Sequence, residues 1–395
     1  MNVLESRTWV FSRLFLKSTS GSRNGPNKAE VSDRRSIPDQ PETKAHRVYA
    51  TLNRRVEEAG GTTALAQSLG PFAGEDKVTA YPAVTVAIIN YNGRRFLDEL
   101  LLSLRDQTLA PTETVLIDNN SSDDSVAYVR NNYHWVRTIP ESSNLGFAKA
   151  GNLAVSSCDS ELVALLNTDI KLDPAWLESL VAPAAREASI AAVASKLRLY
   201  ADPSRLNGVG GAMNYLGYTW DRGMFEVDAG QLDQPAEVLF ASAGAALFRR
   251  STFLTAGGFD ERFFMYHEDV DLCWRFWLLG HTVLTAPRAL ALHHFGGSTS
   301  QAKGFDWREL IGERNNIRAL IKNYEAANVR RALLHLLRLR QPAARKAAQL
   351  RNFAWNMRHL PDTLRHRKRI QEQRVRTDAE ITRLIVQSPN VPIRL

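Results

Sequence analysis

Short runs of apolar residues alternate along the chain with segments in which apolar residues recur at helical spacing. Three of the runs have the length of buried strands and lie at residues 84–90, 113–117 and 161–166. Between the first two, the apolar residues of segment 94–107 lie three or four positions apart, as on one face of a helix. Strands that alternate with helices predict an α/β fold with a doubly wound, mainly parallel sheet. Such a sheet binds ligands at the carboxyl ends of its strands.

The remaining segments differ in pattern and indicate where the parts of the protein begin and end. Residues 1–80 are rich in polar and charged residues, which predicts a largely disordered leader with one short helix. Gly and Tyr are frequent over 195–236, which predicts loops above the ligand site. Past Gly304 the pattern is amphipathic and helical. We therefore predict an α/β domain over 81–302 and a helical C-terminal extension over 303–395.

Charge is unevenly distributed along the chain. The net charge is +8, and residues 303–395 hold 21 Lys and Arg against eight Asp and Glu, so the remainder is slightly acidic. A basic extension on an acidic body favours a surface partner for the extension, and we expect no nucleic acid. Two interpretations of the extension stay open: contact with an anionic membrane surface, and a solvated helical face.

The sequence also bears on where the protein works. No apolar run approaches the roughly 18–20 residues that a membrane-spanning helix needs. The apolar residues near the N-terminus are interrupted by Ser12 and Arg13, unlike those of a signal peptide. We expect a cytoplasmic location, with the basic extension as the candidate for peripheral contact with the inner face of the cell membrane.

Two of the predicted strands are followed directly by aspartates. Asp118 ends the second strand and faces a polar turn, where its carboxylate can accept the imino N–H of a pyrimidine or simply cap the turn. Asp169 follows the third strand in Asn167-Thr168-Asp169. A carboxylate there can hold a hard divalent cation beside a diphosphate, or it can be a turn residue.

A glycine-containing turn lies between these two strands. Segment 144–152 reads as a turn into a helix N-terminus, which can approach phosphate or sugar groups closely. It is neither a Gly-x-Gly-x-x-Gly fingerprint nor a Walker loop, which argues against a dehydrogenase or an NTPase.

The densest group of acidic side chains lies in segment 257–275. Glu268 and Asp269 open a predicted helix. A carboxylate in the first turn gains about 0.3–1 kcal/mol from the helix dipole, so a purely structural role is one interpretation. A carboxylate among aromatic residues also suits a general base. Asp271 and Arg275 are spaced for a structural ion pair.

Two adjacent histidines follow another predicted strand. The imidazole of His293 or of His294 can complete a metal site that begins at Asp169, although paired histidines are more often structural.

In this order, these segments resemble the family 2 glycosyltransferases of GT-A type, especially the rhamnosyltransferase-like members of bacterial surface-polysaccharide assembly. The matching strings lie within about residues 84–325 and are VAIINYNG, VLIDNNSSDDS, NLGFAKAGN, LLNTD, ASAGAALFRR, GGFDERFFMYHEDVDLCWR and HHFGGS. The resemblance implies a GT-A catalytic domain over 81–302. It also implies an enzyme that moves a sugar from a nucleotide-diphosphate donor to a carbohydrate hydroxyl.

The resemblance further implies roles for single residues. Asp269, beside Glu268, matches the catalytic base. Asp169 and His293 match ligands of Mg²⁺ or Mn²⁺, with His294 as the alternative. Asn167 replaces the first aspartate of the Asp-x-Asp metal motif. The implied nucleotide and donor pocket comprises Asn90, Tyr91, Asp118, Asn120, Asn144, Gly146, Asn152 and Asn167.

The implied reaction is a single displacement with inversion at the anomeric carbon. The best estimate of the donor is dTDP-rhamnose, and the acceptor is a glycan or a lipid-linked saccharide. A sugar-nucleotide nucleotidyltransferase is an alternative, but the polar loop at 90–94 is too short for its Gly-rich, basic loop. A non-catalytic carbohydrate-binding protein on the same fold is a second alternative. Intact Asp118, Asp169 and Asp269 argue against it.

Overall fold

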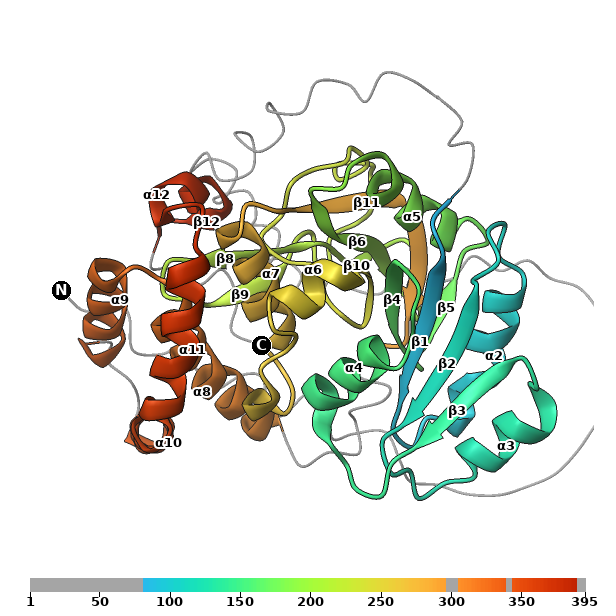
Figure 1. The fold of residues 1–395 in the computed structure, drawn as a ribbon, viewed down its shortest axis with the longest axis horizontal. Helices are drawn as coiled ribbons and strands as arrows, with labels where there is room; N and C mark the ends of the chain where they lie inside the picture. The colour runs from blue at the N-terminus through green and yellow to red at the C-terminus, as the bar shows by residue number, and fades with distance from the viewer. Residues whose placement is uncertain (1–80, 296–304, 339–342, 389–395) are drawn as a thin grey trace, which may run out of the picture. The chain divides into compact units, whose positions relative to one another are not determined.

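A computed structural model describes residues 81–295, 305–338 and 343–388, and these belong to one compact unit, Thr43–Leu395. The predicted leader and its short helix lie outside the described residues. The central sheet has nine strands in the order β3-β2-β1-β4-β10-β6-β11-β5, with β7 beside β6 (Figure 1). Its strands are β1 (Val84–Asn90), β2 (Glu113–Asp118), β3 (Val136–Pro140), β4 (Leu162–Asn167), β5 (Ile170–Leu172), β6 (Ile190–Leu199), β7 (Leu206–Val209), β10 (Ala245–Arg249) and β11 (Thr282–His293).

Helices cover both faces of this sheet. Alternate residues of β1 point to opposite sides, so Val86 and Ile88 belong to one hydrophobic core and Ala87 and Ile89 to the other. The first core is covered by α2 (Arg94–Arg105), α3 (Ser125–Asn132) and α5 (Trp176–Arg186). The second is covered by α4 (Gly146–Ser156), α6 (Arg250–Thr255) and α7 (Glu268–Leu278). The α/β fold predicted from the sequence is confirmed.

The strands β3, β2, β1 and β4 run parallel, whereas β10, β5 and β7 run antiparallel to their neighbours. The prediction of loops over 195–236 is wrong for part of that range. Besides β6 and β7 it contains β8 (Gly211–Asn214) and β9 (Thr219–Asp221), which form a small second sheet in the order β12-β8-β9. These strands are too short for alternation to be read. At Gly211 an added Cβ would lie 1.9 Å from the ring of Phe240, so the glycine that breaks the pattern permits close packing.

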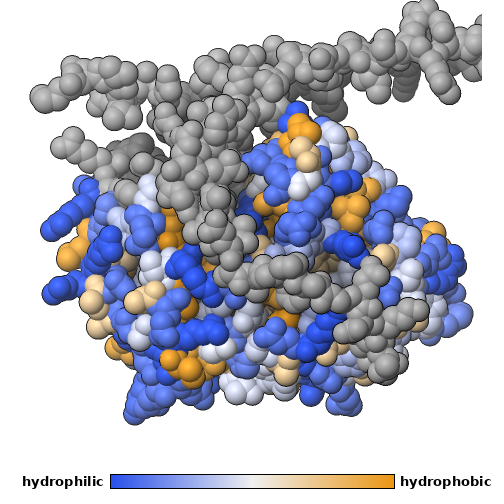
Figure 2. Space-filling view, turned by 90° about the horizontal axis from the view of Figure 1, so that it is seen from above, coloured by the Kyte–Doolittle hydropathy of each residue, from blue (hydrophilic) through white to orange (hydrophobic). Residues whose placement is uncertain are grey.

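The C-terminal extension is helical, as predicted. It contains α8 (Phe305–Asn323), α9 (Ala326–Arg338), α10 (Ala343–Arg358), α11 (Leu360–Gln373), α12 (Asp378–Ile381) and the short strand β12 (Ile385–Val386). Figure 1 shows these helices beside α7 and the small sheet, away from α2 and α3. None of the helices in the described ranges is long and apolar enough to cross a bilayer. In the face seen in Figure 2, hydrophobic side chains form small patches among hydrophilic ones.

Buried charges join α8 to the segment that carries α7. Lys322 donates to Asp260 at 2.7 Å and to Asp271 at 2.8 Å, and Arg318 donates to Asp260 at 2.7 Å. All four side chains are buried. Removal of one partner from such a group typically costs about 3–5 kcal/mol, because a charge is left uncompensated inside the protein. These buried ion pairs therefore attach the extension to the α/β domain, and loss of any one of them would strongly destabilise the fold.

Candidate active site

Three polar side chains meet where β2, β1 and β4 end. In the strand register Asn90 lies opposite Asp118, and its predecessor Ile89 lies opposite Asn167. Asn90 Nδ2 donates to Asp118 Oδ1 at 2.6 Å, and the Ser121 backbone N–H donates to Asp118 Oδ2 at 3.0 Å. Asn90 and Asp118 are buried. The structure thus joins three of the residues predicted to bind the nucleotide at one edge of the sheet.

The predicted glycine turn begins α4. Asn144 Oδ1 accepts from the Gly146 N–H at 2.9 Å, and Gly146 has a φ of +74°. An added Cβ at Gly146 would lie 2.4 Å from Phe264, which lies in the loop before the acidic helix, so only glycine fits here. Asn152 exchanges hydrogen bonds with the backbone of Phe259, at 2.8 and 3.0 Å. Segment 144–152 therefore packs directly against the acidic segment.

The other two predicted donor-site residues lie on the turns beside these strands. Tyr91 is 45% exposed, directly after β1. Asn120 has a φ of +63° in the turn after β2, a conformation that asparagine tolerates better than most residues. Their predicted contacts with the donor stay predictions.

Asp169 and His293 lie close together because β5 pairs with β11. Ile170 lies opposite His293 in that register, and the Asp169 Oδ1 to His293 Nε2 distance is 3.6 Å. The other ring nitrogen of His293, Nδ1, hydrogen-bonds to Oδ1 of Asn207. His294 points elsewhere: its Nε2 lies 3.0 Å from Glu99 and its ring stacks on Tyr200. Of the two histidines, His293 is the one beside Asp169.

The loop before α7 has a strained backbone that α8 holds in place. Phe264, Tyr266 and His267 all have positive φ, between 65° and 74°. Each such non-glycine residue costs on the order of 1–3 kcal/mol unless its surroundings fix it. Asn315 of α8 supplies that fixation, because its Nδ2 contacts the carbonyl oxygens of Phe263, Met265 and Tyr266 at 2.7–3.1 Å.

Glu268 and Asp269 follow this loop as the first residues of α7. Glu268 is buried, and burial together with the neighbouring Asp269 raises its pKa well above the ordinary value, which favours a neutral carboxylic acid. Asp269 is half-buried and keeps an open side. Its Oδ2 accepts from the Ala243 N–H at 3.1 Å, while burial raises its pKa.

The predicted structural pair in the same helix is confirmed. Arg275 donates to Asp271 Oδ2 at 2.8 Å, and both side chains are buried.

One acidic side chain of the site escaped the sequence analysis. Asp221 ends β9, and Ser242 Oγ donates to its Oδ1 at 2.8 Å. Burial raises the pKa of Asp221 to about 6, the charge of Asp269 adds to this shift, and His293 opposes it. Asp221 therefore lies among the residues predicted from the motifs. Only a non-repetitive, glycine-rich segment surrounds it in the sequence, so no pattern singled it out.

Several of the predicted residues lie on adjacent elements. Asn167 at the end of β4 lies close to the loop that holds Asp269. Its backbone N–H donates to Gly244 O at 2.8 Å, and Gly244 follows Ala243, whose N–H donates to Asp269.

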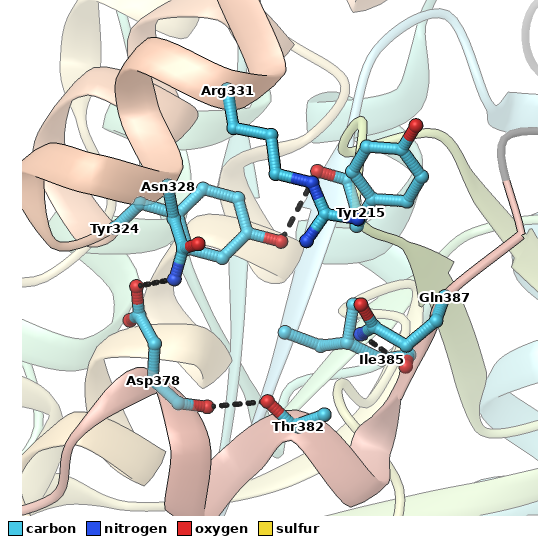
Figure 3. A pocket seen from close by; sticks show the side chains of 8 residues that line it. All are labelled: Tyr215, Tyr324, Asn328, Arg331, Asp378, Thr382, Ile385 and Gln387. Atoms are coloured by element: carbon cyan, nitrogen blue, oxygen red, sulfur yellow. Dashed lines mark hydrogen bonds between the residues drawn. The ribbon is translucent and has the colours of Figure 1, made fainter.

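The pocket of Figure 3 lies elsewhere, at the junction of the extension with the small sheet. None of the predicted site residues lines it; its walls are Tyr215, Tyr324, Asn328, Arg331, Asp378, Thr382, Ile385 and Gln387.

Comparison with known proteins shows the family of the chain. Residues 85–255 match the model of glycosyl transferase family 2. The N-acetylglucosaminyl-diphospho-decaprenol L-rhamnosyltransferase of Mycobacterium tuberculosis is 30% identical over 237 residues, 55% of this chain and 77% of that protein. The pre-mycofactocin glycosyltransferase of the same species is 28% identical over 219 residues, 53% of this chain and 42% of that protein.

Among solved structures, GalNAc-T7 with UDP, GalNAc and Mn²⁺ aligns with a TM-score of 0.51 at 15% identity. The alignment covers 76% of this chain and 62% of that one. This likeness concerns the fold, which is that of the GT-A glycosyltransferases. The chain belongs to glycosyltransferase family 2, and it is a sugar-transferring enzyme, as its motifs predict.

The raised pKa values make a prediction about pH. An acceptor hydroxyl loses its proton during glycosyl transfer, and the carboxylate that takes the proton must be ionised. If Asp269 is the carboxylate that takes this proton, kcat/KM should fall with decreasing pH through a midpoint above 3.8, because burial raises the pKa of Asp269 above that ordinary value. Steady-state kinetics from pH 4 to 8 measure this, with circular dichroism at each pH to exclude unfolding. A rate that stays constant down to pH 4 would contradict the electrostatic description of the site.

Proposed function

We propose that this enzyme transfers rhamnose from dTDP-rhamnose to a hydroxyl of a glycan or lipid-linked saccharide, with inversion at the anomeric carbon. The mycobacterial relative, an L-rhamnosyltransferase by name, supports the sugar and a diphospho-lipid-linked acceptor. The observation that carries the proposal is the grouping of Asp118, Asp169 and Asp269 around the carboxyl ends of β2, β4 and the start of α7. These are the positions from which a base, a diphosphate and an incoming alcohol can be held together.

Asp269 is the proposed general base. Its half-buried carboxylate is held by the Ala243 N–H. Among the described residues no lysine or arginine contributes to its pKa shift, so no paired cation there weakens it as a base. Glu268 is the proposed neutral partner, since burial and the neighbouring Asp269 raise its pKa well above the ordinary value. Asp118 and Asn90, joined by a 2.6 Å hydrogen bond, are proposed to receive the nucleobase. Tyr91, Asn120, Asn144, Gly146, Asn152 and Asn167 complete the proposed donor pocket.

Asp169 and His293 are the proposed ligands of a divalent cation, Mg²⁺ or Mn²⁺. Since His293 Nδ1 faces the amide oxygen of Asn207, that nitrogen carries the proton and Nε2 presents a lone pair 3.6 Å from Asp169 Oδ1. Two acceptors that face each other favour a cation between them. Within the described ranges no three His, Cys, Asp or Glu side chains group as a metal site, so the diphosphate would supply further ligands. Such a cation neutralises the charge of the departing nucleoside diphosphate.

The division of the chain into a leader over 1–80, a catalytic domain over 81–302 and an extension over 303–395 remains part of the proposal. In this division the extension supports the catalytic domain, since Asn315 and Lys322 contact the segment around α7.

The first prediction from this mechanism concerns Asp269→Asn. The amide cannot take a proton from the acceptor, so kcat should fall by about 10²–10⁴-fold while the dissociation constant of dTDP stays within about twofold. A coupled assay for released nucleoside diphosphate measures turnover and also distinguishes a transferase from a nucleotidyltransferase, which would release pyrophosphate. Asp106→Asn, the same chemical change at an exposed aspartate, serves as control. Near-normal turnover of Asp269→Asn would refute the assignment of the base.

The second prediction concerns the cation. Calorimetry should find that Mn²⁺ tightens dTDP binding to the wild type, and that Asp169→Ala and His293→Ala remove this gain without changing binding in EDTA. Asp106→Ala, at an exposed aspartate, should behave as the wild type. Equal Mn²⁺ dependence in all four proteins would exclude the proposed ligands.

Peripheral membrane contact through the extension is the last part of the proposal. Leu337, Leu350 and Met357 are 58–62% exposed, and each is followed by an exposed arginine. Leu350 and Met357 lie two turns apart on one side of α10. Apolar side chains beside arginines suit the surface of an anionic bilayer.

Co-sedimentation with vesicles tests this contact. The wild type should bind vesicles of phosphatidylglycerol and phosphatidylcholine, and Leu337→Glu combined with Leu350→Glu should bind several-fold less. Two results would contradict this contact: equal sedimentation of the wild type and the double variant, or wild-type binding to phosphatidylcholine vesicles as strong as to the mixed vesicles.

A further inference from the structure

Asp221 and Asp269 are held by two consecutive residues of one loop. Ser242 Oγ donates to Asp221 Oδ1 at 2.8 Å, and the N–H of Ala243 donates to Asp269 Oδ2 at 3.1 Å. The loop runs directly into β10, which lies in the centre of the sheet between β4 and β6. The two carboxylates therefore have a fixed spacing, set by a rigid element and not by a mobile surface segment.

Asp221 also lies near His293, one of the two proposed metal ligands. His293 is close enough to lower its pKa, and Asn207, which bonds His293, is followed by Gly208. An added Cβ at Gly208 would lie 2.6 Å from Cβ of Asp221. The glycine thus allows β9 to approach β7 closely, which brings Asp221 next to the strand that carries Asn207, the partner of His293.

The charge of Asp221 is not neutralised as the structural carboxylates of this protein are. Asp260 and Asp271 each bond a buried lysine and a buried arginine. For Asp221, by contrast, no lysine or arginine within the described residues contributes to its electrostatics, and the neighbouring Asp269 carboxylate raises its pKa further. A partly buried carboxylate without a cationic partner lowers the stability of the fold. Its presence therefore indicates a role in function and not in structure.

We propose that Asp221 binds hydroxyl groups of the sugar at the reaction centre and thereby helps to select which hydroxyl reacts. The proposal rests on the proposed function and extends it. A carboxylate has two oxygens that accept hydrogen bonds, and vicinal sugar hydroxyls supply donors at matching separation. One oxygen of Asp221 is oriented by Ser242, and the other is available to the sugar. Asp269 remains the base, and Asp221 holds the sugar beside it.

The sugar in question belongs either to the donor or to the acceptor, since both meet at this point during transfer. The same chemistry serves both sources. Hydrolysis of the donor without an acceptor separates them, because only the donor sugar takes part in that reaction.

The test compares the wild type, Asp221→Asn and Asp202→Asn, the last at an exposed aspartate. The substrates are an N-acetylglucosaminyl-diphospho-lipid and dTDP-rhamnose, or whichever UDP-, dTDP- or GDP-linked sugar the wild type uses, with Mn²⁺. A hydrogen bond to a charged group is worth roughly ten- to hundredfold, so Asp221→Asn should lower kcat/KM by that factor and Asp202→Asn by less than twofold. Binding of free dTDP should not change.

Two further readouts complete the test. Donor hydrolysis that falls together with transfer assigns Asp221 to the donor sugar, whereas unchanged hydrolysis with a raised acceptor KM assigns it to the acceptor. The melting temperature of Asp221→Asn should equal or exceed that of the wild type, because an uncompensated charge is removed.

Three results would overturn the proposal. These are a kcat/KM within twofold of the wild type, a loss of dTDP affinity that parallels the loss of activity, and a melting temperature several degrees lower. A wild-type protein that transfers from none of these donors refutes the proposed function itself, and with it the role of Asp221.

Discussion

The site depends on the hydrogen bonds and ion pairs between α8 and the segment that leads into α7. Asn315 contacts three carbonyl oxygens of the loop before Glu268, and Lys322 and Arg318 bind Asp260 and Asp271 on either side of that loop. Three residues of this loop have a positive φ, which they would leave without such contacts. The extension therefore does more than add a basic surface. It determines where the first turn of α7 lies relative to the sheet.

A second support reaches the site from the end of the described chain. Strand β12 pairs with β8, and β8 pairs with β9, whose last residue is Asp221. The C-terminal part thus supports both acidic elements that face the sheet, α7 through α8 and β9 through β12. Among the described residues, Asp260 and Asp271 bond to cations of α8, whereas Asp221 and Asp269 accept from the neutral donors Ser242 and Ala243. The type of partner thus distinguishes the two groups: carboxylates paired with cations stabilise the fold, and carboxylates with neutral partners remain available for chemistry.

The sequence predicted what depends on short stretches of chain. The pattern of apolar runs located β1, β2, β4 and α2, and the spacing of Asp271 and Arg275 predicted their ion pair. Pairings between distant residues could not be read in this way. Lys322 lies 51 positions from Asp271 and has no local feature that marks it as a partner. His293 and His294 are neighbours on a strand end, and only the register of β5 with β11 tells which one faces Asp169. Asp221 ends a three-residue strand in a glycine-rich segment without a periodic pattern, so only the three-dimensional structure places it in the site.

The most direct measurement of the central claim is the turnover of Asn315→Ala. If α8 sets the position of Asp269, loss of the three carbonyl contacts should lower kcat by about tenfold or more, since small misplacements of reacting groups have effects of this size. The dissociation constant of dTDP should stay within about twofold, because Asn90 and Asp118 lie on other elements. Asn328→Ala, which removes a 2.6 Å bond to Asp378 away from the site, provides the matched control. A kcat for Asn315→Ala equal to that of the control would contradict the account.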